Sequence, residues 1–217
     1  VYDTTIGWRF VNPKMVAAYG TDSMPETADN VAEDYGINRA DQDAFALRSQ
    51  ERWATANAAG RFADELCKVS IPKRKGDSSI VVEDEHPRPQ TTAESLSKLR
   101  GINGADKTVT AGNASGVVDG AAAVVVKSAS QAQADGDSPL ARIVSWGIVG
   151  LEPAIMAYGP VPSSRLALEK AGLTIDDIDR WEINEAFAGQ AVACVKDLGL
   201  DVSKVNVNGG AVGLGHP

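Results

Sequence analysis

Two polar residues near the C-terminal end of the chain are the best candidates for chemistry, and the first is Asn184. It opens the run Asn-Glu-Ala-Phe-Ala188, where an expected strand passes into an expected helix. Ligand contacts in α/β proteins usually lie at such strand ends. A side-chain amide there can orient a water molecule or polarise a carbonyl oxygen. The same amide also suits the N-terminal cap of the helix, and this structural interpretation stays open.

The second candidate is His216, one of only two histidines, in the glycine-rich run Gly213-Leu-Gly-His-Pro217. Glycine lets the backbone approach a ligand closely. A neutral imidazole can donate a hydrogen bond to a developing oxyanion, or accept a proton from a thiol near pH 7. A single histidine in a loop is more often an ordinary polar residue, and this structural interpretation stays open.

Weaker candidates lie upstream. The run of small residues from Thr110 to Gly116 could form a slot for an extended substrate arm, with Ser115 bonding to its amides, or simply a tight turn. Arg88, between two prolines, could stack on an aromatic ring or be an exposed side chain without a functional role. Met24 and Met156 could border an apolar acyl chain or fill gaps in the core.

A layered α/β protein is expected to position these residues, because strands and helices alternate in the second half of the chain. Asn38 is expected to cap a helix that ends at Gly60, while Gly172 and Gly199 should close two later helices. The first 25 residues indicate an ordered loop. Helices are expected over 27–35, 39–59, 95–100, 130–134, 163–171 and 185–198, and strands over 66–71, 79–83, 108–112, 120–126, 141–148, 180–183 and 204–207.

Composition excludes several classes of function. The net charge of -8 argues against nucleic acid as a partner. No apolar run reaches the ~18–20 residues of a membrane span, and no signal segment is evident at Val1. Cys67 and Cys194 lack metal-type or redox-type spacing and are both expected to be buried. A reducing cytoplasm is the expected compartment.

Taken together, these motifs resemble the thiolase family along essentially the whole chain. Asn-Glu-Ala-Phe and the loop ending Gly-His-Pro stand in the family's order and at compatible spacing, with Asn-Ala-Ser-Gly116 and Asp119-Gly-Ala-Ala upstream. The resemblance implies the thiolase fold, an α/β fold of α-β-α-β-α layers with an inserted loop domain, present here as a partial chain. It divides the chain into a coenzyme-A-binding loop domain (1–117), the end of the N-terminal half (118–139) and the start of the C-terminal half (140–217).

The resemblance also assigns roles to residues. His216 would help form an oxyanion hole and support activation of a nucleophilic cysteine, and Asn184 would hold a catalytic water. Ala186 and Phe187, with Glu185, would shape that wall. Further residues are implied around the substrate: Ala111, Ala114 and Ser115 beside the pantetheine arm, Arg88 against the adenine, and Met24 and Met156 at the acyl pocket.

The implied activity is cleavage of a 3-oxoacyl-CoA by coenzyme A through a cysteine thioester. The segments Thr5–Pro13 and Asp22–Thr27 resemble the branch that acts on 3-oxoadipyl-CoA, giving succinyl-CoA and acetyl-CoA. In that branch Ser23 stands where the acetoacetyl-CoA enzymes carry a histidine. Arg9 is a candidate partner for the distal carboxylate, or else part of a structural ion pair. Coenzyme A is a substrate, and no metal or redox cofactor is implied.

The family's two reactive cysteines are expected before Val1 and after Pro217, because neither Cys67 nor Cys194 matches them. The 217 residues alone are therefore expected to be inactive, and the glycine-rich ending indicates a fragment. The intact enzyme is expected to be a dimer or tetramer. The alternatives are an acetoacetyl-CoA or fatty-acid thiolase, a decarboxylating ketoacyl synthase on the same fold, and a non-catalytic coenzyme-A-binding module. Asn-Glu-Ala-Phe argues against the synthase, which typically has a second histidine there.

Overall fold

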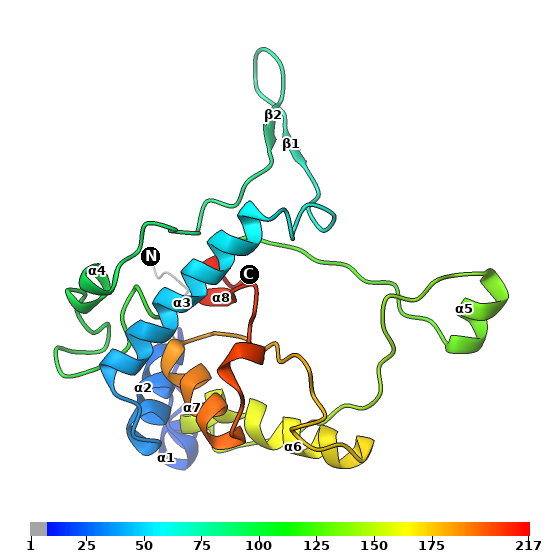
Figure 1. Cartoon of the computed structure of the whole chain (residues 1–217). Helices are drawn as coiled ribbons and strands as arrows, with labels where there is room; N and C mark the ends of the chain where they lie inside the picture. Colours follow the sequence, from blue (N-terminus) through cyan, green and yellow to red (C-terminus); the bar gives the residue numbers. More distant parts are fainter. Residues whose placement is uncertain (1–7) are drawn as a thin grey trace.

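The computed structural model describes residues 8–217. Figure 1 shows a body of packed helices from which a β-hairpin and one short helix project in different directions. The α-helices are α1 (Pro13–Tyr19), α2 (Met24–Asp34), α3 (Arg39–Ala58), α4 (Ala93–Ser97), α5 (Ala129–Asp135), α6 (Pro160–Ala171), α7 (Ala188–Leu198) and α8 (Ala211–Leu214). Two 3-10 helices, η1 (Pro153–Tyr158) and η2 (Val202–Lys204), and the antiparallel strands β1 (Val69–Ile71) and β2 (Ser79–Val81) complete the set.

Helix α3 is the centre of the body, and it packs against α4, α7 and α8. Its start is fixed as expected, because the side-chain oxygen of Asn38 accepts a hydrogen bond from the backbone N–H of Asp41 at 2.8 Å. Helix α2 packs on α7 and η1. It begins at Ser23 with a capping box, in which Glu26 accepts the Ser23 N–H. These hydrogen bonds hold the pKa of the Glu26 carboxyl below its usual value.

A buried carboxylate on α2 holds the loop that precedes the small-residue run. One oxygen of Asp29 accepts from the Thr108 N–H, the Thr108 hydroxyl and the Val109 N–H at 3.0–3.1 Å. Its other oxygen accepts from the Asn103 amide at 2.7 Å. Four donors satisfy the acceptor capacity of this carboxylate, which makes its burial tolerable. The loop is therefore fixed against α2.

The apolar core lies around α7. Cys194, Val195 and Leu198 pack with Val161 of α6 and with Val205, and all of them are buried. The expected burial of Cys194 is confirmed. The same expectation was wrong for Cys67, which is exposed in the irregular segment between α3 and β1. That segment lies at the base of the projecting hairpin, where no packed layer covers it (Figure 1).

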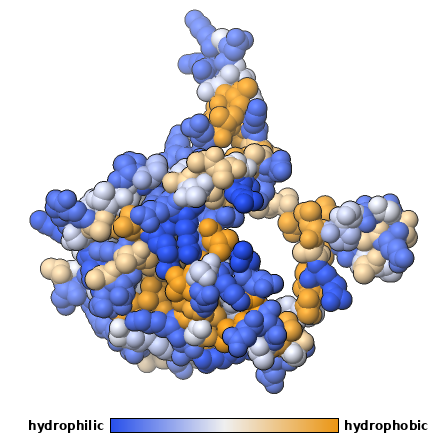
Figure 2. Space-filling model, viewed as in Figure 1, coloured by the Kyte–Doolittle hydropathy of each residue, from blue (hydrophilic) through white to orange (hydrophobic). Residues whose placement is uncertain are grey.

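Most expected helices are found, but the N-terminal segment and the central strands differ. Residues 13–19 form α1 instead of a loop, because Asn12 accepts the Lys14 N–H and Pro13 suits a first helical position. Residues 120–126 and 141–148 carry no regular secondary structure, and neither segment pairs with a strand among residues 8–217. Their apolar side chains are exposed, with Val125 at 90% and Ile148 at 82%. Figure 2 shows this hydrophobic surface on the arms that join α5 to the body.

The expected strands 66–71 and 79–83 are confirmed as β1 and β2, while the remaining expected strands are reduced to isolated bridges. Trp181 pairs in parallel with Val205, which joins the expected strands 180–183 and 204–207 at one point. Thr110 pairs only with Gly101. The pairing of Trp181 with Val205 does not continue into a ladder, because the next residue, Asn206, has φ 45°, outside the extended region that a strand needs.

Candidate active site

The structure brings the two main candidates together. The side-chain nitrogen of Asn184 lies 3.1 Å from Nε2 of His216, and both residues are exposed. An amide and a neutral imidazole make one hydrogen bond in either of two ways. The amide N–H donates when the ring proton is on Nδ1, and the amide oxygen accepts when it is on Nε2. In the second form, the Nε2–H can donate to an oxyanion instead when a substrate oxygen displaces the amide oxygen.

Asn184 is not a helix cap. Helix α7 begins at Ala188 and its N-cap is Phe187, whose side chain offers no cap hydrogen bond. The structural interpretation of Asn184 that stayed open from the sequence is therefore wrong. Residues 182–187 lie outside any helix, and the Asn184 amide contacts His216 in the C-terminal loop.

The backbone around the pair is held by the small-residue run. The His216 N–H donates to the Gly116 carbonyl at 2.8 Å, and Val117 and His216 form a parallel bridge. Gly116 is required there, since a Cβ atom would lie 2.2 Å from the ring of His86. The His86 ring in turn contacts the Val212 carbonyl at 3.2 Å. The loop carrying His216 is thus fixed from two sides.

The small-residue run also fixes the wall beyond Asn184. Both the N–H and the hydroxyl of Ser115 donate to the Ala186 carbonyl, at 3.0 and 2.9 Å. Ala114 and Phe187 form an antiparallel bridge. The Ser115 hydroxyl proton is therefore used inside the protein, although its oxygen can still accept a hydrogen bond.

The remaining candidates lie apart from this pair. The Arg88 side chain is exposed, and its backbone N–H donates to Gln50 at 2.9 Å. Ala111 is exposed in the turn after Thr110. Met24 and Met156 are 50% and 47% exposed at α2 and η1, so neither fills a gap in the core.

The two features proposed for the branch of the family lie at the N-terminal end. Ser23 is the N-cap of α2. The Arg9 guanidinium lies over the ring of Phe10, 5.3 Å from its centroid, and both residues are exposed. The start of the Thr5–Pro13 motif lies outside the described residues.

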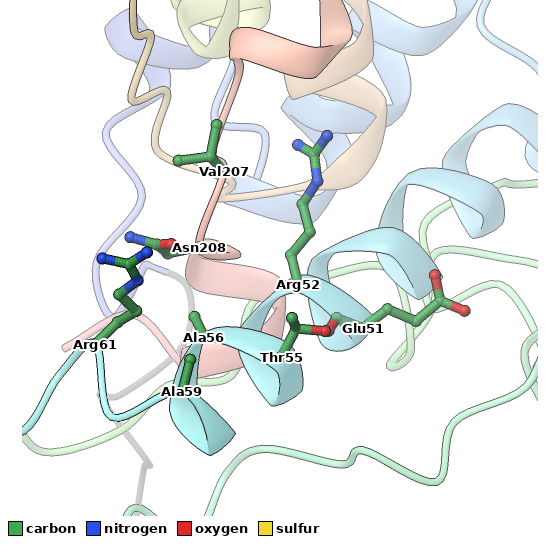
Figure 3. Close-up of a pocket in the computed structure, with 8 residues that line it drawn as sticks. All are labelled: Glu51, Arg52, Thr55, Ala56, Ala59, Arg61, Val207 and Asn208. Carbon is green, nitrogen blue, oxygen red and sulfur yellow. The ribbon is translucent and has the colours of Figure 1, made fainter.

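Two cavities of the described chain lie away from the pair. Figure 3 shows a cavity of about 330 Å³ between α3 and the segment before α8, lined by Glu51, Arg52, Thr55, Ala56, Ala59, Arg61, Val207 and Asn208. Arg52 donates to the backbone carbonyls of Val202, Val205 and Asn206, so it braces this segment against α3. A second cavity of about 320 Å³ lies beside Leu214. Neither is lined by Asn184 or His216.

Sequence reasoning missed the depth of Glu185, which is 1% exposed. Its oxygens accept from the Ser49 hydroxyl at 2.6 Å, the Asn206 amide at 2.8 Å and the Val212 N–H at 3.1 Å. The sequence did carry a signal: in an extended segment, Glu185 shares a face with the apolar Ile183, while Asn184 faces the other way. Nothing in the sequence pointed to Ser49.

The two cysteines of the chain are expected to react very differently. Burial raises the pKa of the Cys194 thiol to about 11, against a small opposing effect of the Gln190 amide. At pH 8 its thiolate fraction is therefore about 0.1%. We expect iodoacetamide to modify exposed Cys67 within minutes and to spare Cys194 until the protein is unfolded in urea. Peptide mapping by mass spectrometry checks this, and equal labelling of the two in the folded state would contradict the packing around α7.

Residues 8–217 contain neither a helix suited to span a membrane nor a cluster of side chains suited to hold a metal ion. None of the helices within residues 8–217 has the length and apolar content needed to cross a membrane. Over the same residues, no group of three or more His, Cys, Asp or Glu side chains is placed to hold a metal ion.

Comparison with known protein families matches both parts of the chain. The family described as "Thiolase, N-terminal domain" matches residues 8–130, and "Thiolase, C-terminal domain" matches residues 137–217. Among curated proteins, the beta-ketoadipyl-CoA thiolase of Pseudomonas aeruginosa is 57% identical over 100% of this chain and 54% of its own length. The 3-oxoadipyl-CoA/3-oxo-5,6-dehydrosuberyl-CoA thiolase of Escherichia coli is 53% identical over 100% and 55%.

Solved structures agree in fold. The acetyl-CoA acetyltransferase of Bacillus anthracis superposes with a TM-score of 0.88 at 46% identity, covering 91% of this chain and 50% of that one. Human mitochondrial 3-ketoacyl-CoA thiolase in complex with CoA superposes with a TM-score of 0.85 at 49% identity, covering 91% and 49%. The chain spans about half the length of the relatives it matches. It belongs to the thiolase family and has the thiolase fold over that half.

Proposed function

We propose that this chain is part of a thiolase that cleaves 3-oxoadipyl-CoA with coenzyme A into succinyl-CoA and acetyl-CoA. The observation that carries the proposal is the contact between Asn184 and His216, two exposed groups that can stabilise an oxyanion. The names of the similar curated proteins support the choice of substrate. Reaction class, substrate and partners all belong to this proposal, since the chain spans about half of those relatives.

In the proposed reaction, a cysteine thiolate outside this chain attacks the C3 ketone carbon of the substrate. The C2–C3 bond then breaks, its electron pair leaves with the acetyl-CoA enolate, and a proton is delivered to C2. Coenzyme A finally attacks the acyl-cysteine thioester, releasing succinyl-CoA and the cysteine. Negative charge builds on oxygen in each step, and donors placed in advance lower such barriers.

His216 is proposed to donate from Nε2 to that oxygen and to support formation of the cysteine thiolate. Asn184 is proposed to hold a water molecule that donates a hydrogen bond to an oxygen on which negative charge builds during the reaction. The amide keeps this capacity, because its contact with His216 uses only one of its hydrogen-bonding positions. Ala186 and Phe187 form the adjoining wall.

The coenzyme A arm is proposed to run past Ala111, Ala114 and Ser115 toward an adenine at Arg88, with the acyl group bordered by Met24 and Met156. All but Ala114 and Ser115 are exposed, and those two are partly exposed, so each can be reached from solvent. The intact enzyme is proposed to be a dimer or tetramer. A reducing cytoplasm is the proposed compartment, because both cysteines of the chain are free.

The test is turnover by the native protein that contains this chain. We expect loss of 3-oxoadipyl-CoA that depends on coenzyme A and yields acetyl-CoA and succinyl-CoA in equal amounts. The kcat/KM should exceed that for acetoacetyl-CoA by about tenfold or more, because a site that bonds the distal carboxylate rejects a substrate without it.

Two results would contradict the proposal. A preference for acetoacetyl-CoA would favour a biosynthetic-type enzyme, and a similar protein of Allochromatium vinosum is named acetyl-CoA acetyltransferase. Binding of coenzyme A without turnover of either substrate would favour a non-catalytic module. The intact mass of the native protein, measured on the same preparation, shows how much chain accompanies these residues.

A further inference from the structure

Glu185 occupies a position that the proposed chemistry does not explain. It is 1% exposed, while its neighbour Asn184 is exposed to solvent. The three donors to its carboxylate come from three separate parts of the chain: Ser49 of α3, Asn206 of the loop after η2, and Val212 of α8. A buried carboxylate with fixed donors on both oxygens has little freedom to move.

One side of this network holds the loop that carries His216. The Ser49 hydroxyl, which donates to Glu185, also accepts the N–H groups of Gly210 and Gly213 at 3.2 Å each. A Cβ at Gly210 would lie 2.4 Å from the Glu185 carboxyl carbon, so the loop packs directly on this group. Val212, bonded to the same carboxylate oxygen as Ser49, stands four residues before His216.

The other side of the network holds the segment that carries Asn184. The Asn206 side chain accepts the Ile183 N–H and donates to the Ile183 carbonyl, both at 2.8 Å. Its amide also donates to Glu185. Asn206 can reach both because it adopts φ 45°, a conformation that asparagine tolerates better than most residues. The segment from Ile183 to Glu185 is thus fixed at both ends of Asn184.

We propose that Glu185 is a positioning residue: its buried carboxylate sets the separation and orientation of Asn184 and His216. The inference rests on the proposed thiolase function for its kinetic consequence. Its geometric content, that the carboxylate fixes the contact between the two side chains, can be tested without turnover.

Glu185→Gln is the sharpest variant because it keeps the size of the side chain and removes only acceptor capacity. If the glutamine NH2 points toward Val212, two donors, this NH2 and the Val212 N–H, face each other without an acceptor. With its NH2 toward Asn206, the glutamine faces an amide whose other contacts with Ile183 forbid a flip. In either orientation at least one of the three donors loses its acceptor. Glu182→Gln is the control for loss of charge: Glu182 is exposed on the same segment, its charge is close enough to be repelled by Glu185, and its side chain makes no hydrogen bond within residues 8–217.

In the native, full-length protein we expect Glu185→Gln to lower kcat by roughly 10- to 100-fold with KM for coenzyme A within about twofold. In a His216→Ala background the same change should cost less than about threefold, because the contact between Asn184 and His216 that Glu185 is proposed to set no longer exists. Glu182→Gln should leave both parameters unchanged. Equal fold-losses in the two backgrounds would overturn the inference.

Proton NMR of the imidazole groups gives a readout independent of turnover. The His216 signal, assigned by its loss in His216→Ala, should move in Glu185→Gln and stay fixed in Glu182→Gln. An unmoved signal would overturn the inference even in an active enzyme. If the native protein shows no thiolysis but the His216 signal still moves in Glu185→Gln, the proposed function is contradicted and the positioning role of Glu185 is retained.

If Glu185→Gln does not fold, as judged by circular dichroism, Ser49→Ala replaces it in both measurements. This change removes one donor to Glu185 and the acceptor for Gly210 and Gly213. The expected loss of kcat is smaller, about 3- to 10-fold, again confined to proteins that retain His216. A loss that persists in the His216→Ala background would count against the inference here as well.

Discussion

His216→Ala is expected to lower kcat for thiolysis by about 100- to 1,000-fold, with KM for coenzyme A within about threefold. The ring is exposed, and its recorded side-chain contact is the hydrogen bond with Asn184, so removing it costs little stability. The loss arises because the ring donor is used on an oxyanion that exists only along the reaction path. Steady-state kinetics with 3-oxoadipyl-CoA and the melting temperature together check this prediction.

Asn184→Ala should show the same split with a smaller loss of about 10- to 100-fold, because the amide acts through a bound water. The double variant should lose less than the product of the two single losses, since the two groups serve one oxyanion site. Asn57→Ala is the matched control at an exposed position on α3 and should be kinetically silent. A raised KM with kcat unchanged would assign both side chains to substrate binding alone.

Gly209→Ala is expected to lower the free energy of unfolding by about 2–5 kcal/mol. Gly209 has φ 83°, in the left-handed region where a Cβ is strained. The same Cβ would lie 2.8 Å from the Ser49 carbonyl oxygen and the Trp53 nitrogen, both backbone atoms of α3 that cannot rotate away. Urea unfolding followed by circular dichroism measures the change.

Gly199→Ala separates the backbone strain at a left-handed φ from the clash of the added Cβ with α3. Gly199 has φ 67°, but a Cβ there would meet no atom within 4 Å. Its substitution should therefore cost only the conformational strain of about 1–2 kcal/mol. Equal losses for the two variants would show that the loop before α8 does not pack on α3 as closely as described, and would weaken the basis for fixing His216.

Local features of the fold could be predicted because they depend on neighbours in sequence. Asn38 caps α3, and Gly172 and Gly199 adopt left-handed conformations that end α6 and α7, all as expected. The start of α7 was predicted three residues early, because helix propensity alone does not show that residues 185–187 bond to other segments. Ser115 and Asn113 hold that stretch outside the helix through the Ala186 carbonyl and the Ala188 N–H.

Strand pairing could not be predicted in the same way, because a sheet is defined by distant partners. Residues 120–126 have the apolar, β-branched composition of a buried strand, yet they are exposed and unpaired within the described chain. The composition of a segment indicates that it can form a buried strand, but it does not specify a pairing partner. Trp181 and Val205 do pair, because α7 and the loop after it bring the chain back next to the segment that carries Trp181.

The candidate site was visible in the sequence only as separate motifs. Residue chemistry singled out Asn184 and His216, but not their contact across 32 positions. The network beneath them depends on Ser49, more than 130 positions from Glu185, and on the unusual backbone of Asn206. Such contacts follow from tertiary packing, which a single sequence does not display.

The most direct test of the oxyanion site is a crystal structure of the native protein, with its nucleophile replaced by alanine, in complex with an acyl-CoA. We predict the thioester oxygen at about 2.7–3.1 Å from Nε2 of His216, with a water on Asn184 completing the site. A thioester oxygen bound elsewhere, with His216 still paired to Asn184 and facing solvent, would contradict the assignment.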